Sequence, residues 1–236
     1  MRRFLLVLLA LAIAGGIETG AAGQKEDGSW TSEFTVEKTE LAPTGRNPYF
    51  VLEPGYELVL EDGNERLVIT VLNETKMVDG VETRIVQERE TKSGHVIEVS
   101  RNYFAISTRN NGVFYFGEDV DMYKDGKVTS HDGSWQSGKD GARFGLAMPG
   151  QVLLKAKYYQ EVAPKVAMDR AEIVSITEKV KTPAGEFLRV LKVAETTPLE
   201  LMAKEHKYYV AGIGLVQDGS VKLVKYGPTG NDHGRP

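Results

Sequence analysis

Cysteine is absent from the 236-residue sequence. This absence excludes disulfide bonds, thiolate metal ligands and a cysteine nucleophile. Histidine is also scarce, and no two of the four histidines have the spacing of paired zinc ligands. No serine lies in a Gly-x-Ser-x-Gly nucleophile elbow. We therefore expect no catalytic residue, metal site or cofactor, and a fold that depends on an ordinary hydrophobic core. The four histidines are His95, His131, His206 and His233.

The charges show no bias that would indicate a polyanionic partner. The sequence holds 29 Lys and Arg against 33 Asp and Glu, a net charge of −4, and the two signs are interleaved. A basic stripe would indicate nucleic acid, and a polybasic run would indicate anionic lipid. We expect neither partner.

Long apolar runs are absent except at the start. Arg2 and Arg3 precede Phe4 to Ala14, an apolar run of about eleven residues, and small residues follow up to Gly23. This run has the length of a signal-peptide core and is shorter than the roughly 20 residues of a spanning helix. The pattern predicts a cleaved signal peptide over 1–23. We expect an exported protein, periplasmic or extracellular, without a transmembrane anchor after cleavage.

The rest of the chain divides into three parts by composition. Residues 24–46 are polar, with one possible strand at Phe34 to Lys38, and residues 227–236 have the composition of a disordered tail. Between them, residues 47–226 alternate short β-prone runs with turn residues, which fits a single β-rich domain.

Turn dipeptides divide this domain into strands. Asp62-Gly63, Asn111-Gly112 and Asp218-Gly219 each separate two β-prone runs, as in hairpins. We predict an all-β fold, an antiparallel meander that forms an open or half-barrel, with at most one or two short helices. The best helix candidate is Val152 to Glu161. The expected strands are Tyr56 to Leu60, Arg66 to Leu72, Val81 to Glu88, His95 to Ser107, Val113 to Phe116, Asp169 to Thr182, Glu186 to Ala194, Glu205 to Val210, Leu215 to Gln217 and Val221 to Tyr226.

Residues 117–150 differ from their surroundings. They are rich in glycine and lack a clean alternation of apolar and polar residues. A long irregular segment inside a compact domain is usually functional. We expect a loop that covers the concave face of the sheet, either as a movable lid or as a permanently packed cover.

Two sequence motifs, one near the start of the β-rich domain and one near its end, resemble those of a family of uncharacterised bacterial exported proteins. Members of that family open with NPYFPLKPG and close with KYYAPGVGLV, and the corresponding segments here begin at Asn47 and Lys207. Their strand pattern is similar to that of lipoprotein-carrier-like half-barrels. The resemblance implies a curved sheet that holds a hydrophobic ligand or a partner, and it implies no activity. The chain departs from the family where relatives have Trp and Asp-Trp, since it has Tyr56-Glu57-Leu58 and Asn102-Tyr103 there.

Four residues are candidates for a ligand site. Because strand side chains alternate, Lys207 and Tyr209 share one face of their strand with Glu205. That face suits either a cavity for an amphipathic ligand or a solvent-exposed face with a cross-strand ion pair. Trp135 and Tyr159 have rings that either stack on a ligand or fill the core.

Glu118, Asp119 and Asp121 form an acidic cluster. Clustered carboxylates bind Ca²⁺ in some turns, but the spacing of an EF-hand is absent. Acidic side chains also serve as catalytic groups in hydrolases, which would require Glu118, Asp119 and Glu161 to converge in a concave site.

Three functions remain open. The first is a non-enzymatic binding or carrier protein for a lipid-like or other amphipathic small molecule. The second is a structural or assembly module that pairs through a sheet edge with a protein partner. The third is a hydrolase that uses carboxylates. A wide cavity favours the first, and converging carboxylates with a raised pKa favour the third.

The signal peptide is directly testable. Protein recovered from outside the cytoplasm should begin close to Gln24, because small residues at 21–23 end the predicted signal. N-terminal sequencing of the exported protein measures this, and a chain that still begins at Met1 would contradict it.

Overall fold

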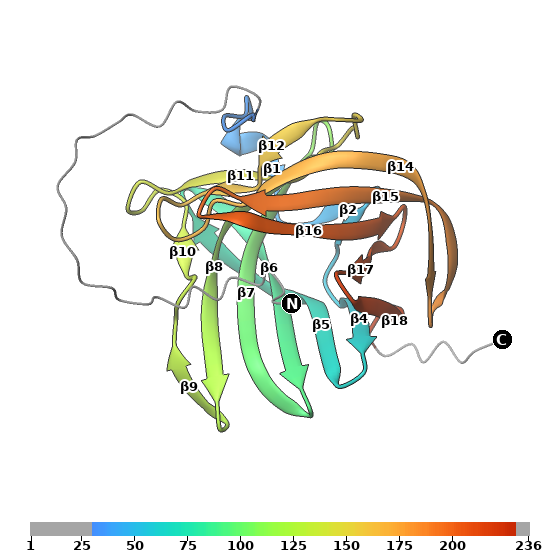
Figure 1. Cartoon of the computed structure of the whole chain (residues 1–236). Coiled ribbons are helices and arrows are strands. Elements are labelled where there is room, and N and C mark those ends of the chain that lie inside the picture. The colour runs from blue at the N-terminus through green and yellow to red at the C-terminus, as the bar shows by residue number, and fades with distance from the viewer. Residues whose placement is uncertain (1–29, 230–236) are drawn as a thin grey trace.

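The computed structural model describes residues 30–229, so the predicted signal peptide lies outside the described residues. Within that range the chain is built almost wholly of strands (Figure 1), and its one helical element is the 3-10 turn η1 (Lys38–Glu40). The predicted all-β class is confirmed. In chain order the strands are β1 (Leu41–Ala42), β2 (Gly45–Asn47), β3 (Phe50–Leu52), β4 (Tyr56–Asp62), β5 (Glu65–Val78), β6 (Val81–Lys92), β7 (His95–Ser107), β8 (Val113–Lys124), β9 (Lys127–Ser130), β10 (Trp135–Gln136), β11 (Arg143–Met148), β12 (Lys157–Tyr159), β13 (Glu161–Val162), β14 (Arg170–Thr182), β15 (Gly185–Thr197), β16 (Glu200–Val210), β17 (Gly214–Asp218) and β18 (Val221–Pro228).

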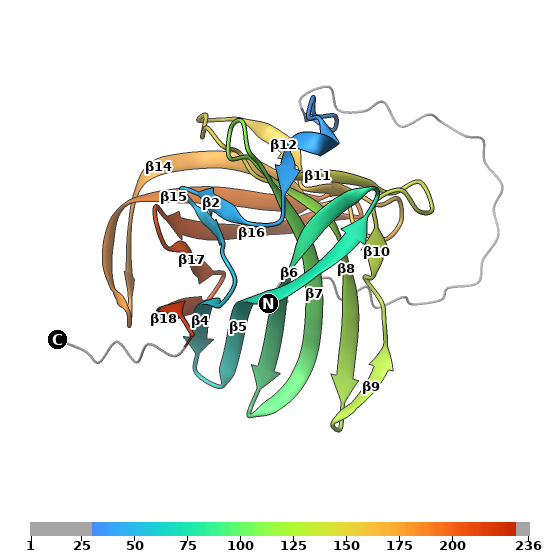
Figure 2. The same ribbon diagram turned by 180° about the vertical axis from the view of Figure 1, so that it is seen from behind.

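The main sheet is an antiparallel barrel that is nearly closed. Its order is β12-β14-β15-β16-β17-β18-β4-β5-β6-β7-β8-β11-β13. Strands β14 to β16 arch over the open side of β4 to β8, as both views show (Figure 2). The two end strands, β12 and β13, are separated in the chain by Gln160 alone, so the ends of the sheet meet there. A Cβ at Gly145 would collide with the backbone of Gln160, which explains why glycine suits this close approach.

Tight turns join the long strands. Asp79 and Gly80 have φ of 49° and 76°, as a two-residue hairpin with two left-handed positions requires. The β4–β5 turn departs from the prediction by one residue. Asp62 pairs with Glu65, so the loop is Gly63-Asn64. Of those two, only Gly63 has a positive φ, of 57°.

Apolar side chains form clusters on both sides of the sheet. The interior cluster includes Leu52, Leu60 and Leu191, all fully buried. A second cluster lies on the outer face of β6 to β8 and is covered by the segment before β1. Its members are Val78, Val81, Ile85, Tyr103, Ala105, Phe114 and Phe116, and the covering side chains include Phe34, Val36, Leu41 and Phe144.

This packing corrects the prediction of a strand at Phe34 to Lys38. Residues 34–37 belong to no strand, and Lys38 begins η1. Phe34 and Val36 contact the outer cluster through their side chains. The alternation of apolar residues therefore reflects side-chain packing without backbone pairing.

The predicted helix at Val152 to Glu161 is wrong. Lys157–Tyr159 pairs with β14, and Glu161–Val162 pairs with β11. Lys155 has a φ of 68°, which no right-handed helix can continue through. Pairing with distant strands thus overrides the local helix propensity.

Residues 117–150 are mostly strand, which corrects the prediction of a loop that roofs the concave face. The segment contains the last two thirds of β8 and all of β9, β10 and β11. Two features hide the alternation in the sequence. The inward-facing Glu118 is polar, and bulges interrupt the pairing of β8 with β7 and with β11.

The last described residues belong to the sheet. Gly227 and Pro228 are part of β18, and the backbone N–H of Thr229 donates to Gly55 at 2.6 Å. The expected tail is therefore wrong for residues 227–229, and its remaining residues lie outside the described range. Within residues 30–229, no helix has the length and apolarity needed to cross a membrane.

Candidate functional site

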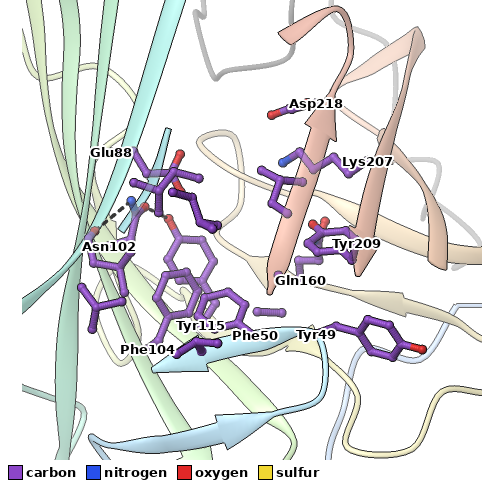
Figure 3. Close-up of a pocket in the computed structure, with 18 of the residues that line it drawn as sticks. Tyr49, Phe50, Glu88, Asn102, Phe104, Tyr115, Gln160, Lys207, Tyr209 and Asp218 are labelled. Carbon is purple, nitrogen blue, oxygen red and sulfur yellow. Dashed lines mark hydrogen bonds between the residues drawn. The ribbon is translucent and has the colours of Figure 1, made fainter. Parts of the chain in front are cut away.

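The barrel encloses a cavity of about 180 Å³. Its walls are divided between apolar side chains and carboxyl groups (Figure 3). The apolar lining includes Tyr49, Phe50, Val51, Tyr56, Leu58, Ile69, Val71, Val86, Phe104, Ala147, Ile213 and Leu215. The polar lining consists of Glu88, Glu98, Ser100, Asn102, Tyr115, Glu118, Gln160, Glu161, Asp169, Glu195, Lys207, Tyr209 and Asp218.

The β2–β3 hairpin borders the cavity with Tyr49 and Phe50. Asn47 holds this hairpin in place. Its Nδ2 donates to the carbonyl oxygens of Asn111 and Pro149, at 2.8 and 2.9 Å, and its Oδ1 accepts from the N–H of Tyr49 at 2.8 Å. Asn47 is only 2% exposed, so its side chain serves as an internal anchor.

A bulge in β8 determines which of its residues reach the interior. Tyr103 is opposite Gly117, but the next residue of β7, Phe104, is opposite Tyr115. Phe116 is therefore the extra residue, and it packs in the outer cluster. As a result Tyr115 and Glu118 both line the cavity although they are three residues apart.

Hydrogen bonds order one wall of the cavity. The Tyr115 hydroxyl donates to Asn102 Oδ1 at 2.6 Å, and Asn102 Nδ2 donates to Ser100 Oγ at 3.0 Å and to the Val86 carbonyl at 3.2 Å. The rings of Tyr115 and Phe104 stack with centroids 4.7 Å apart. These contacts fix the position of the Tyr115 ring against the cavity.

Lys207 is the one cation among the residues that line the cavity, and it lies on the opposite wall with Tyr209 and Asp218 (Figure 3). Its Nζ is 2.8 Å from Glu195 Oε2, and the other oxygen of Glu195 accepts from Gln160 Nε2 at 3.0 Å. Burial alone would lower the pKa of Lys207, but Glu195 and Asp218 outweigh that cost and keep the pKa well above its usual value. The ammonium is thus ionised and already paired.

The carboxyl groups of the cavity repel one another in a poorly solvated space. Burial, reinforced by neighbouring carboxylates, raises the pKa of Glu98 and of Glu118 to about 8. Burial also raises the pKa of Asp218 to about 7, against the pull of Lys207. The pKa of Glu88 is raised by burial as well. Burial and repulsion from Asp169 raise the pKa of Glu161 well above its usual value, and burial and repulsion from Glu195 raise the pKa of Asp169 to about 6. Several of these acids therefore hold protons near neutral pH.

Two of the four residues predicted for a ligand site line the cavity. Lys207 and Tyr209 share its wall, so their strand face is the inner one, and the alternative of a solvent-exposed face is wrong. Trp135 and Tyr159 are outside the lining. Trp135 is buried behind Tyr115, with ring centroids 5.3 Å apart, and Tyr159 makes an edge contact with Trp30 at 6.5 Å.

The acidic cluster does not converge, because its residues alternate across β8. Glu118 points into the cavity, whereas Asp119 Oδ2 is 2.9 Å from Lys76 Nζ and Asp121 Oδ1 is 2.9 Å from His131 Nδ1. No group of three or more metal-ligating side chains suitable for one ion occurs in residues 30–229. Glu118 and Glu161 both line the cavity, as a carboxylate hydrolase would require, but Asp119 does not.

Sequence reasoning missed most of the acidic lining, including Glu88, Glu98, Glu195 and Asp218. A signal was present on β7, where Glu98, Ser100 and Asn102 repeat with the period of a strand and all are buried. On a solvent-facing sheet such a polar repeat is ordinary, so the repeat by itself indicates no cavity.

The chain matches no family model, no curated protein and no solved structure. The resemblance to the exported bacterial family therefore stays a prediction.

The protonated state of Glu118 is testable through stability. Its pKa is about 8 in the folded protein, against roughly 4.5 when unfolded, so the folded state retains a proton that the unfolded state releases. Stability should therefore fall as pH rises from about 4.5 to about 8. Glu118→Gln removes this loss and should raise the unfolding midpoint at pH 8.5 by several degrees, since 1 kcal/mol corresponds to about 2–4 °C at this size. At pH 4 the two proteins should unfold at similar temperatures.

Asp119→Asn is the matched control, because it removes the neighbouring charge on the outer face. Asp119 is bonded to Lys76, so this variant should gain no stability at pH 8.5. Parallel curves of unfolding temperature against pH for wild type and Glu118→Gln would contradict the buried protonated acid.

Proposed function

We propose that the chain is an exported binding protein that holds a small amphipathic molecule inside its barrel without altering it chemically. The observation that supports this most is the interior cavity, whose lining combines apolar side chains with fixed polar groups. Apolar surface favours hydrocarbon, and fixed polar groups orient the rest of a ligand.

The cavity volume limits the size of this molecule. Pockets for drug-sized ligands start at about 300 Å³, and cavities of about 150 Å³ hold a single aromatic ring. A cavity of about 180 Å³ therefore suits a ring or a short chain with a polar end, and it is too small to enclose a long acyl chain.

The nearly closed sheet argues against the alternative of a module that pairs through its edge. The strands at the two ends of the sheet order are short, with three residues in β12 and two in β13. These two strands offer few backbone groups for a partner strand, whereas β14, of which β12 covers only three residues, is the longer edge among the described strands. A hollow interior also has no role in such pairing.

Calorimetric titration with three probes of one shape tests the binding proposal. The probes are 4-phenylbutan-1-ol, 4-phenylbutan-1-amine and 4-phenylbutanoate, which share a ring and a chain and differ in charge. Wild type should bind at least one of them. Val86→Trp should weaken that binding at least tenfold, because Val86 is 1% exposed and lines the cavity.

Val174→Trp places the same bulk on an exposed position of β14 and should leave binding unchanged. Circular dichroism and thermal unfolding establish that both variants fold. If wild type binds none of the probes, or if the two variants behave alike, the proposal fails.

A hydrolase is the second candidate, favoured by the paired acids of the cavity. Glu161 Oε1 accepts a hydrogen bond at 2.8 Å from the backbone N–H of Asp169, whose carboxyl also lines the cavity. A protonated acid beside an ionised one is the arrangement that general acid–base hydrolysis uses.

Hydrolysis of 4-nitrophenyl esters and glycosides tests this second candidate. Turnover above the uncatalysed rate that is lost in Glu161→Gln and in Glu118→Gln, but kept in Asp119→Asn, would establish it. Turnover no faster than in buffer would exclude these substrate classes and leave binding as the function.

A further inference from the structure

We propose that the polar end of the bound molecule is a positively charged amine, so that the ligand is an amphipathic organic cation. This inference rests on the proposed binding function and names the class of ligand. It starts from the imbalance of charge in the cavity, where seven carboxyl groups face a single ammonium group.

The carboxyl groups surround the cavity from many elements. Glu88, Glu98 and Glu118 lie on β6, β7 and β8, one wall of the barrel. Glu195 and Asp218 lie on β15 and β17, Glu161 lies on β13, and Asp169 directly precedes β14. The other groups in the lining that titrate are Lys207 and the tyrosines Tyr49, Tyr56, Tyr115 and Tyr209. Carboxyl groups therefore line the cavity on both walls, and they become negative as they lose their protons.

Two of these carboxyl groups lack a well-aligned hydrogen bond at one oxygen. Glu118 Oε1 and Asp218 Oδ1 are buried without a well-aligned hydrogen bond, although the Tyr115 hydroxyl and the Trp135 indole N–H approach the Glu118 carboxyl, and each acid is only 6% exposed. A buried polar atom without a partner destabilises the folded protein, and more so when it is charged. An ammonium N–H is the donor that satisfies a carboxylate oxygen best.

Other ligand charges fit this arrangement less well. An anion would meet seven acids, and the one ammonium is already bonded to Glu195. A single metal ion needs several ligands at about 2–2.6 Å, and no three acids of the described chain are close enough to supply them. Acids that are spread round a cavity suit a larger cation, such as an alkylammonium group with its hydrocarbon on the apolar side chains.

The aromatic wall adds to the fit. The stacked rings of Phe104 and Tyr115 lie beside the carboxyl groups, and both line the cavity. Aromatic faces attract cations and also pack against hydrocarbon. The cavity thus offers contacts for both halves of such a ligand.

Capture of a cation must be linked to loss of protons. Glu118 and Asp218 bind an ammonium group most strongly when they are ionised, whereas burial and repulsion keep them partly protonated in the empty cavity. Affinity for the cation should therefore rise as pH increases from 5.5 to 8.5, because an alkylammonium group stays charged over that range.

The same three probes test the inference. At pH 8.5 wild type should bind 4-phenylbutan-1-amine at least tenfold more tightly than 4-phenylbutan-1-ol, and 4-phenylbutanoate should bind most weakly. The ratio of amine to alcohol affinity should fall several-fold at pH 5.5. The double variant Glu118→Gln, Asp218→Asn should remove most of the preference at pH 8.5 and keep its affinity for the alcohol.

Asp119→Asn is again the control, since it removes an acid from the outer face and should keep the full preference. Alcohol or carboxylate bound as tightly as the amine would overturn the inference while leaving the binding function intact. A preference for the amine that survives unchanged in the double variant would also overturn it. Failure of all three probes would overturn the binding function itself, and the inference with it.

Discussion

The repulsion among carboxyl groups inside a curved sheet is the constraint that governs this structure. Seven acids in a poorly solvated cavity cannot all be ionised, because each charge loses hydration and meets others of the same sign. Three devices reduce the cost. Several acids retain protons, Lys207 neutralises part of the charge, and Gln160 and the N–H of Asp169 donate hydrogen bonds to Glu195 and Glu161.

The backbone conformation turns these acidic side chains into the cavity, where they repel one another. The extra residue in β8 turns Glu118 inward and leaves Phe116 to the outer cluster, where it stacks on Phe144 of β11. The bulge depends on Gly117, whose φ of 139° disfavours other residues and whose missing Cβ leaves room for the backbone of Trp135. An acidic interior is thus built into the fold at a position that only glycine accommodates readily.

Much of the fold could be predicted from the sequence, and most of the site could not. Turn residues mark the ends of long antiparallel strands in the sequence. For this reason the expected strand His95 to Ser107 agrees with β7 at both ends. Residues 117–150 gave no such signal, because the inward-facing Glu118 is polar and bulges interrupt the period of two. Lys207 and Tyr209 were identified because alternation along one strand is a local property. The convergence of Glu88, Glu98, Glu118 and Asp218 depends on the closure of the barrel, which links residues more than 100 positions apart.

Stability alone does not explain why acids occupy the interior in place of apolar side chains. A barrel whose core served stability alone would gain from replacing these acids with hydrocarbon, since buried ionic groups often stabilise less than apolar residues of the same size. Glu118 and Asp218 each keep one oxygen without a well-aligned hydrogen bond in the interior. Their raised pKa values are also costly, since a shift of about one pKa unit represents roughly 1.4 kcal/mol. Proteins tolerate such local cost where a site needs it. An ammonium group on a small apolar molecule would supply the missing hydrogen bonds, offset the repulsion and cover the apolar side chains of the lining in one event.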